Sequence, residues 1–159
     1  MKTCCFTGPR IHKLGFSESS PEGIRLKNSI KREIESLYDR GYRRFITGMA
    51  SGIDTYAAEA VIELKKHFSD VILEAALPYP KMGGVTSDDR IRYERILDCA
   101  DKTVVLSENY TPYCFHVRNR YMVDESSCLI AYESDSGGTA YTIKYAQKTG
   151  KEVIFLTDF

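Results

Sequence analysis

Two kinds of hydrophobic pattern alternate along this chain. Short runs that are apolar in succession, such as residues 71–73 and 104–106, predict strands buried on both faces. Longer segments repeat apolar residues every three or four positions, as Ile30 and Ile34 do, and this spacing predicts helices with one buried face. The alternation of the two patterns predicts successive strand–helix–strand units.

The turn signals between these segments divide the chain into elements. The expected strands cover residues 3–6, 44–47, 71–77, 103–106, 127–132 and 152–156. The expected helices cover residues 21 to about 41, 53–68, 87–100, 114–125 and a last one that follows the turn at 135–139 and ends at Gly150. Strands that alternate with helices of this length predict a mostly parallel sheet with helices on both faces. We therefore expect residues 1–159 to form one Rossmann-like, three-layer α/β/α domain, with a loop around Gly83 and Gly84 before the third helix.

Composition limits the classes of function. The chain has 22 Lys and Arg against 22 Asp and Glu, and this neutral balance argues against non-specific nucleic-acid or membrane binding. Its five cysteines show no zinc-type spacing with the three histidines, so we expect reduced thiols and no metal site. With no apolar stretch of membrane-spanning length and no signal peptide, the sequence predicts a cytoplasmic protein.

The most informative turn is Gly48-Met49-Ala50-Ser51-Gly52, set between an expected strand and an expected helix. Glycines allow close approach of a ligand, and the free N–H groups of the following helix attract anions. Asp54 in the first helical turn either caps that helix or accepts a hydrogen bond from a ribose hydroxyl. The alternative is that the glycines serve only the turn geometry.

Further candidates follow other strands at the same predicted sheet edge, where α/β proteins bind ligands. Gly137, Gly138 and Thr139 repeat the turn-to-helix arrangement, although Thr139 would also serve as a simple helix cap. Arg10 and Arg118 are candidate phosphate ligands, because a guanidinium binds phosphate through two parallel hydrogen bonds. Surface charge is the alternative role for each arginine.

Catalytic residues are weakly indicated. Glu59 and Asp124 are the candidate carboxylates and Arg118 the candidate cation, but local ion pairs explain both carboxylates equally well. The scattered histidines do not indicate a catalytic histidine.

Several ordered motifs resemble the SLOG superfamily, which joins the DNA-processing protein DprA with the Lonely-guy phosphoribohydrolases. The similar segments are residues 6–10, 46–54, 57–60, 118–124, 129–132 and 136–139, and they look most like the YpsA/YoqJ-like bacterial branch. The resemblance implies a Rossmann-like fold with a pocket for a nucleotide or nucleotide derivative. It places Thr7, Gly8, Asn119 and Met122 among the ligand-binding residues, together with those above.

The resemblance also bears on activity. Lonely-guy enzymes carry a catalytic glutamate three residues after the threonine of their glycine-rich motif, and Thr142 occupies that position here. We therefore expect a sensor or carrier of a nucleotide-type small molecule that requires no cofactor. The alternatives are a nucleoside-monophosphate glycosidase and a nucleic-acid-associated or protein-interaction adaptor, although the neutral charge argues against nucleic acid. Family resemblance also implies a homodimer.

Overall fold

A computed structural model describes residues 1–80, 87–157 and 159 of the chain. These residues form one sheet, a short 3₁₀ helix and five α-helices. The strands are β1 (Lys2–Thr7), β2 (Tyr42–Thr47), β3 (Ile72–Leu77), β4 (Lys102–Val105), β5 (Cys128–Ala131) and β6 (Glu152–Phe155). The helices are η1 (Ile11–Lys13), α1 (Pro21–Asp39), α2 (Ile53–His67), α3 (Ser87–Cys99), α4 (Cys114–Asp124) and α5 (Gly137–Lys148).

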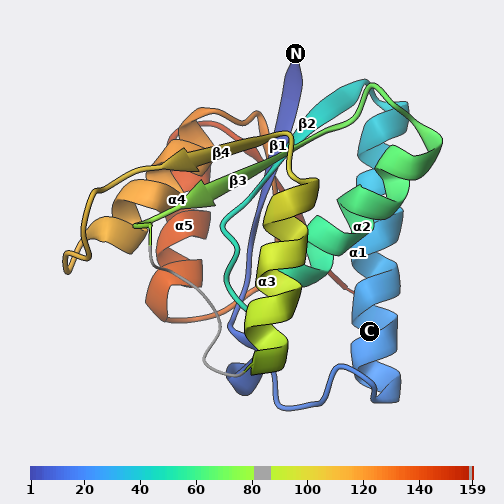
Figure 1. The fold of residues 1–159 in the computed structure, drawn as a ribbon, viewed down its shortest axis with the longest axis horizontal. Helices are drawn as coiled ribbons and strands as arrows, with labels where there is room; N and C mark the ends of the chain where they lie inside the picture. Colours follow the sequence, from blue (N-terminus) through green and yellow to red (C-terminus); the bar gives the residue numbers. More distant parts are fainter. Residues whose placement is uncertain (81–86, 158) are drawn as a thin grey trace.

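The six strands run parallel in the order β4-β3-β2-β1-β5-β6. From β1 the chain adds β2, β3 and then the edge strand β4 on one side (Figure 1). It then crosses back and places β5 on the other side of β1. The strand order therefore reverses between β1 and β5. In an open parallel sheet, the crevice outside the carboxyl ends of the strands at such a point is the usual ligand site.

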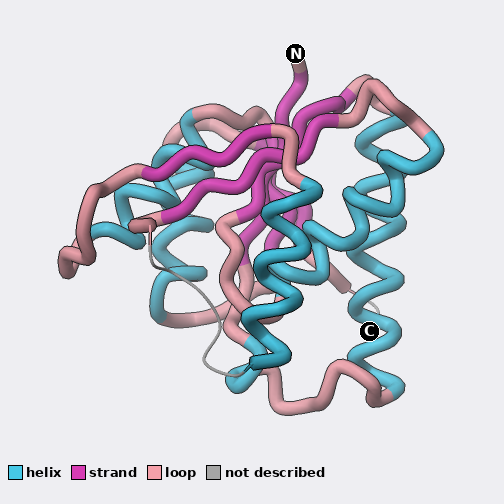
Figure 2. The backbone as a smooth tube through the Cα atoms, viewed as in Figure 1, coloured by secondary structure: helices cyan, strands magenta, loops and turns pink. Residues whose placement is uncertain are grey.

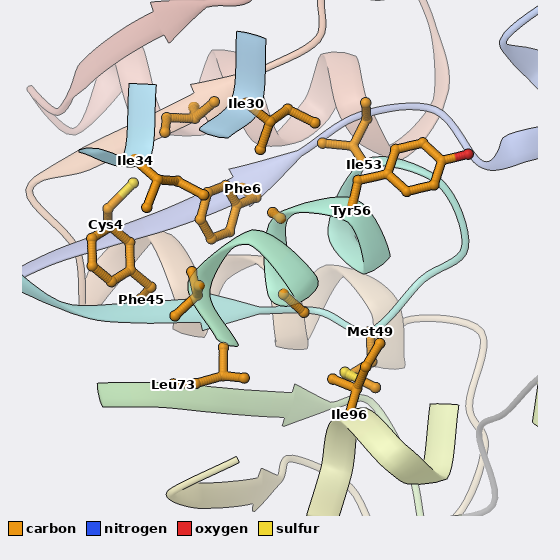
Figure 3. Close-up of a cluster of buried hydrophobic side chains, with 14 of the residues drawn as sticks. Cys4, Phe6, Ile30, Ile34, Phe45, Met49, Ile53, Tyr56, Leu73 and Ile96 are labelled. Atoms are coloured by element: carbon orange, nitrogen blue, oxygen red, sulfur yellow. The ribbon is translucent and has the colours of Figure 1, made fainter. Parts of the chain in front are cut away.

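Helices cover both faces of the sheet. Helices α1, α2 and α3 lie on one side and α4 and α5 on the other, as Figures 1 and 2 show. Side chains on each strand alternate between these layers: Phe45 packs under α1 and α2, whereas the next residue, Ile46, packs under α4 and α5. The larger of the two cores is drawn in Figure 3, where Ile30 and Ile34 of α1 point toward Phe6 of β1.

The predicted fold class is confirmed, and the sheet is entirely parallel among the described strands. Element boundaries differ from the expected ones by a few residues at most. The 3₁₀ helix η1 was not predicted, because three residues are too few to carry a hydrophobic period. The expected loop at Gly83 and Gly84 lies outside the described residues. No helix among the described residues is both long and apolar enough to cross a membrane.

One buried carboxylate lies within the sheet. Glu74 of β3 is 1% exposed and points into the α4–α5 layer. Its carboxylate accepts hydrogen bonds from Arg44 at 2.7 and 3.0 Å and from the Tyr121 hydroxyl at 2.7 Å. Burial and this carboxylate together raise the pKa of Tyr121 to about 12, so the phenol stays protonated and donates. These hydrogen bonds connect β2, β3 and α4.

Candidate functional site

A cavity of about 360 Å³ opens at the carboxyl ends of β1 and β5, where the strand order reverses. Four segments build its wall: the loop after β1, the start of α2, one face of α4 and the start of α5. The lining residues are Phe6, Thr7, Gly8, Pro9, Arg10, Lys13, Ala50, Asp54, Pro112, Phe115, His116, Arg118, Asn119, Ser134, Ser136, Gly137, Gly138 and Thr139. This volume lies at the lower end of the range for small-molecule sites, so one mononucleotide-sized ligand fits it better than a dinucleotide.

Successive residues of the 48–52 turn face different neighbours. Met49 has φ of 64°, which is unusual for a residue with a side chain, and it points into the core beside Ile96 of α3 (Figure 3). Its N–H donates to Thr47 Oγ1 at 3.2 Å, and the N–H of Ala50 donates to Asp54 Oδ2 at 3.3 Å. Gly52 packs against the backbone after β1, because a β-carbon there would lie 2.8 Å from the carbonyl oxygen of Pro9. The turn thus uses these two N–H groups to hold its own shape.

Two buried charges form the bottom of the cavity. Asp54 is 8% exposed and Arg118 is 4% exposed. Gly48 separates them: a β-carbon there would lie 2.7 Å from Arg118 Nη1 and 2.8 Å from Asp54 Oδ2. Burial raises the pKa of Asp54, and Arg118 opposes that rise; burial also lowers the pKa of Arg118, and Asp54 opposes that fall. Each charge therefore helps to keep the other ionised.

Arg118 is held by the protein itself. Its Nη1 donates to the carbonyl oxygen of Gly48 and, at 3.5 Å, to that of Ala76, while its Nε donates to Asn119 Oδ1 at 2.7 Å. A guanidinium fixed in this way contributes positive charge and positions Asn119. It has fewer donors left for a ligand than an exposed arginine has.

The first three residues of α5 line the cavity, whereas α2 contributes only Asp54 to its wall. The N-cap residue of α5, Ser136, makes no side-chain capping bond with a described residue, and Gly137 has φ of 76°. The first N–H groups of a helix have no partner within the helix, so those of Gly137, Gly138 and Thr139 are available at the cavity wall. Two cationic side chains, Arg10 and Lys13, line the same cavity from exposed positions. Helix N-terminus and cations together favour an anion.

The structure brings many of the predicted ligand residues together. Those in the cavity wall are Thr7, Gly8, Arg10, Ala50, Asp54, Arg118, Asn119, Gly137, Gly138 and Thr139. Those outside the wall are Gly48, Met49, Ser51, Gly52 and Met122. Four of them are buried, and the exposed Ser51 accepts a hydrogen bond from the Ile11 N–H at 3.4 Å through its hydroxyl oxygen.

The candidate catalytic carboxylates lie away from the cavity wall. Glu59 pairs with Arg92 at 2.5 Å and with Arg95 at 3.2 Å on the outer side of α2, and Asp124 accepts a hydrogen bond from the Tyr145 hydroxyl at 2.6 Å. Both carboxylates therefore make local interactions with neighbouring side chains, which is the alternative to a catalytic role.

Sequence reasoning missed three side chains of the cavity wall that have distinctive chemistry. Phe115 and His116 precede Arg118 and Asn119 by three residues each, so they share one helix face, and that spacing was the available signal. Lys13 sits on η1 and had no signal in the sequence.

Comparison with known proteins identifies the family. A protein-family model, described as the YspA SLOG family, matches residues 4–157 of the chain. The chain belongs to this family. It is 31% identical over 145 residues to the SPbeta prophage-derived protein YoqJ of Bacillus subtilis, covering 82% of this chain and 85% of that protein. It is 26% identical over 157 residues to a UPF0398 protein of Bacillus thuringiensis, covering 95% and 85%.

Solved structures share the fold of this SLOG chain. DNA processing protein A of Helicobacter pylori, whose single-stranded DNA binding mode has been described, superposes with a TM-score of 0.67 at 16% identity, covering 99% of this chain and 66% of that one. DprA of Streptococcus pneumoniae gives 0.65 at 16% identity, and this chain spans 50% of its length. The molybdenum cofactor carrier protein of Chlamydomonas reinhardtii gives 0.55 at 15% identity, covering 97% and 75%. At these identities the likeness establishes the fold alone.

Thr142 is the residue at which the motif resemblance would place the glutamate of Lonely-guy enzymes. It is 2% exposed, and its hydroxyl donates to the carbonyl oxygen of Gly138 at 2.8 Å. Its side chain is therefore engaged with the backbone of α5, and it is not among the residues that line the cavity.

An ion-pair cluster fixes the loop between η1 and α1. Glu18 pairs with Arg92 of α3 at 2.7 Å and also with Lys27 of α1. Arg92 pairs in turn with Glu59 of α2 at 2.5 Å. Hydrogen bonds from Arg92, opposed by partial burial, lower the pKa of Glu18 to about 2 from an ordinary value of 4.5. The cluster anchors the segment that carries Arg10 and Lys13.

Glu18 should therefore contribute to acid sensitivity. A carboxyl whose pKa is lowered by folding stabilises the protein above its unfolded pKa, and this contribution is lost as pH falls from about 4.5 to about 2. Urea unfolding at several pH values should show wild type more stable than Glu18→Gln at pH 7 and the difference shrinking steadily below pH 4.5. A difference that stays constant down to pH 2.5 would mean that this carboxylate is not stabilised by its neighbours.

Proposed function

We propose that the protein binds a nucleotide-type small molecule in the cavity at the strand-order reversal, with the phosphate on the N-terminus of α5. The observation that carries the proposal is the uncapped start of this helix, whose N–H groups face a cavity also lined by Arg10 and Lys13. Phosphate is the common biological anion that binds to several N–H donors of a helix N-terminus beside cationic side chains.

The bottom of the cavity would bind the ribose of the nucleotide. The buried Asp54 carboxylate has one hydrogen bond, to the Ala50 N–H, in the described part of the chain. Ribose hydroxyls would donate to its remaining acceptor sites and offset the cost of burying this charge. Asn119 accepts from Arg118 through Oδ1, which leaves its Nδ2 group, near Gly138, to donate to the ligand.

Binding without turnover is the activity that this set of residues supports best. Thr142 has no carboxylate and is engaged with the helix backbone, so the position used for catalysis in Lonely-guy enzymes supplies no acid or base. A sensor or carrier of nucleotides needs affinity and release only. We place this role in the cytoplasm, where the five free cysteines would stay reduced.

Two glycines, one at each end of α5, allow a matched test. Gly137 at the cavity and Gly150 just beyond the far end of the helix have φ of 76° and 77°, and a β-carbon at either would meet no atom within 4 Å. Alanine at either position should cost about 1 kcal/mol of stability from backbone strain. Only Gly137→Ala should weaken binding of AMP, by tenfold or more in titration calorimetry, because it distorts the phosphate site.

The same experiment separates the proposal from its rivals. Equal affinity of Gly137→Ala and Gly150→Ala for AMP, or no binding of nucleoside monophosphates to wild type, would contradict it.

A nucleoside-monophosphate glycosidase is the second candidate, favoured by the buried Asp54 carboxylate in the cavity wall. Chromatography of the ligand after incubation decides between the two. The sensor or carrier predicts intact nucleotide, whereas free base would establish hydrolysis.

A further inference from the structure

The cavity has two chemically different walls. On the α5 side, the wall carries serine hydroxyls and the N–H groups of the 137–139 turn. A second part of the lining, the apolar wall, is formed by Pro9, Pro112 and Phe115. These three side chains contain no hydrogen-bonding atom, and proline has no backbone N–H. A ligand that fills this cavity therefore meets both hydrogen-bonding groups and apolar side-chain surface.

Phe115 is held in one orientation by other aromatic rings. Its ring packs edge-to-face with Tyr79, with centroids 6.2 Å apart and planes at 87°. Tyr79 packs in the same way with Tyr110, at 5.7 Å and 86°. Edge-to-face contacts are a favoured geometry of aromatic pairs, so Tyr79 and Tyr110 hold the Phe115 ring in place from outside the cavity wall.

Two planar cations lie near the Phe115 ring, and one of them is the guanidinium of Arg118, which the protein holds in place, 5.6 Å from the ring centroid. The guanidinium of Arg10 is 5.3 Å from the centroid of Phe115. Arg10 is exposed, and its side-chain contact is with the Phe115 ring, so the side chain can move at little cost. Phenyl ring and guanidinium are both planar groups that stack well on heteroaromatic rings.

We propose that the heteroaromatic ring of the ligand inserts between Phe115 and the guanidinium of Arg10, and that the protein recognises this ring by stacking and not by its hydrogen-bonding edge. This inference rests on the proposed nucleotide function and deepens it. The apolar wall gives the edge of a base no matched donors or acceptors, whereas every base has a face that stacks. The ligand class is then nucleoside monophosphates with little discrimination among bases.

Titration calorimetry with AMP, GMP, CMP, UMP and ribose 5-phosphate tests this. The four nucleotides should bind wild type within about tenfold of one another, and ribose 5-phosphate should bind about tenfold to hundredfold more weakly than AMP, as expected for the loss of one stacked base. Phe115→Leu should weaken AMP binding toward that of ribose 5-phosphate and leave ribose 5-phosphate binding unchanged. Unchanged sugar-phosphate binding also shows that the variant is folded.

Two further variants sharpen the result. Tyr113→Leu is the matched control, because Tyr113 begins the same helix but is 72% exposed and does not line the cavity; it should bind like wild type. Arg10→Lys keeps the charge without the planar group, so it should weaken AMP binding more than ribose 5-phosphate binding.

Three results would overturn the inference. They are equal affinity for AMP and ribose 5-phosphate, equal weakening of both ligands by Phe115→Leu, or a preference of more than about a hundredfold for one base over the other three. Each of these leaves phosphate binding intact, and so leaves the proposed function standing. Failure of all five ligands to bind would instead remove the proposed function, and this inference with it.

Discussion

Gly48→Ala should lower the free energy of unfolding by about 2–3 kcal/mol, through overpacking and loss of buried hydrogen bonds, and weaken nucleotide binding with it. The new methyl group would lie 2.7 Å from Arg118 Nη1 and 2.8 Å from Asp54 Oδ2. Both side chains are buried and each is hydrogen-bonded to the turn backbone, so neither moves without leaving a polar group unsatisfied. Chemical denaturation measures the stability change, and calorimetry with AMP measures the change in affinity.

Gly138→Ala is the control for this substitution. A β-carbon at Gly138 would be 3.8 Å from Asn119 Nδ2, an ordinary contact, and alanine favours a helix over glycine by up to about 1 kcal/mol. This variant should be as stable as wild type or slightly more stable. Equal destabilisation of the two variants would mean that the close spacing of Arg118 and Asp54 around Gly48 has no energetic consequence.

Glu74→Ala should be the most destabilising change considered, at about 3–5 kcal/mol, because removing one partner of a buried ion pair leaves the other uncompensated. The substitution would leave the Arg44 guanidinium, whose side chain is 18% exposed, without its 2.7 Å partner. It would also leave the Tyr121 hydroxyl without its acceptor. Urea denaturation of wild type and variant at pH 7 measures the loss.

Glu125→Ala provides the comparison, since Glu125 contacts the same arginine at 3.2 Å from a side chain that is 44% exposed. An exposed pair of this kind is worth about 1 kcal/mol or less. If the two variants lost similar stability, burial would not be what makes the Glu74 network important.

The fold was predictable because the helix caps and the hydrophobic patterns of the sequence indicated the same elements. Ser20 caps α1 as expected, its hydroxyl accepting from the Gly23 N–H, and Pro21 is the first helical residue. The alternation of strand and helix patterns gave the parallel sheet. What the pattern lacked was the strand order, because crossover direction depends on how whole layers pack. The position of the cavity between β1 and β5 follows from that order.

The candidate site was only partly predictable, for a different reason. Glycine spacing identified two turns of similar appearance, but it did not show which N–H groups have partners within the protein. In the 48–52 turn, Thr47 and Asp54 take up two of them. At Gly137 and Gly138 no described side chain does so. Phe115 was missed because an aromatic residue on a helix more often packs in a core than lines a site.

Amide chemical shifts during a titration test the central claim most directly. In a ¹⁵N-labelled sample titrated with AMP, the proposed site predicts the largest shifts at the backbone amides of Gly137, Gly138 and Thr139, with smaller ones in the loop that carries Arg10. Large shifts confined to residues 49–52, with those of 137–139 unchanged, would contradict the account, because the phosphate would then lie on the turn at the start of α2.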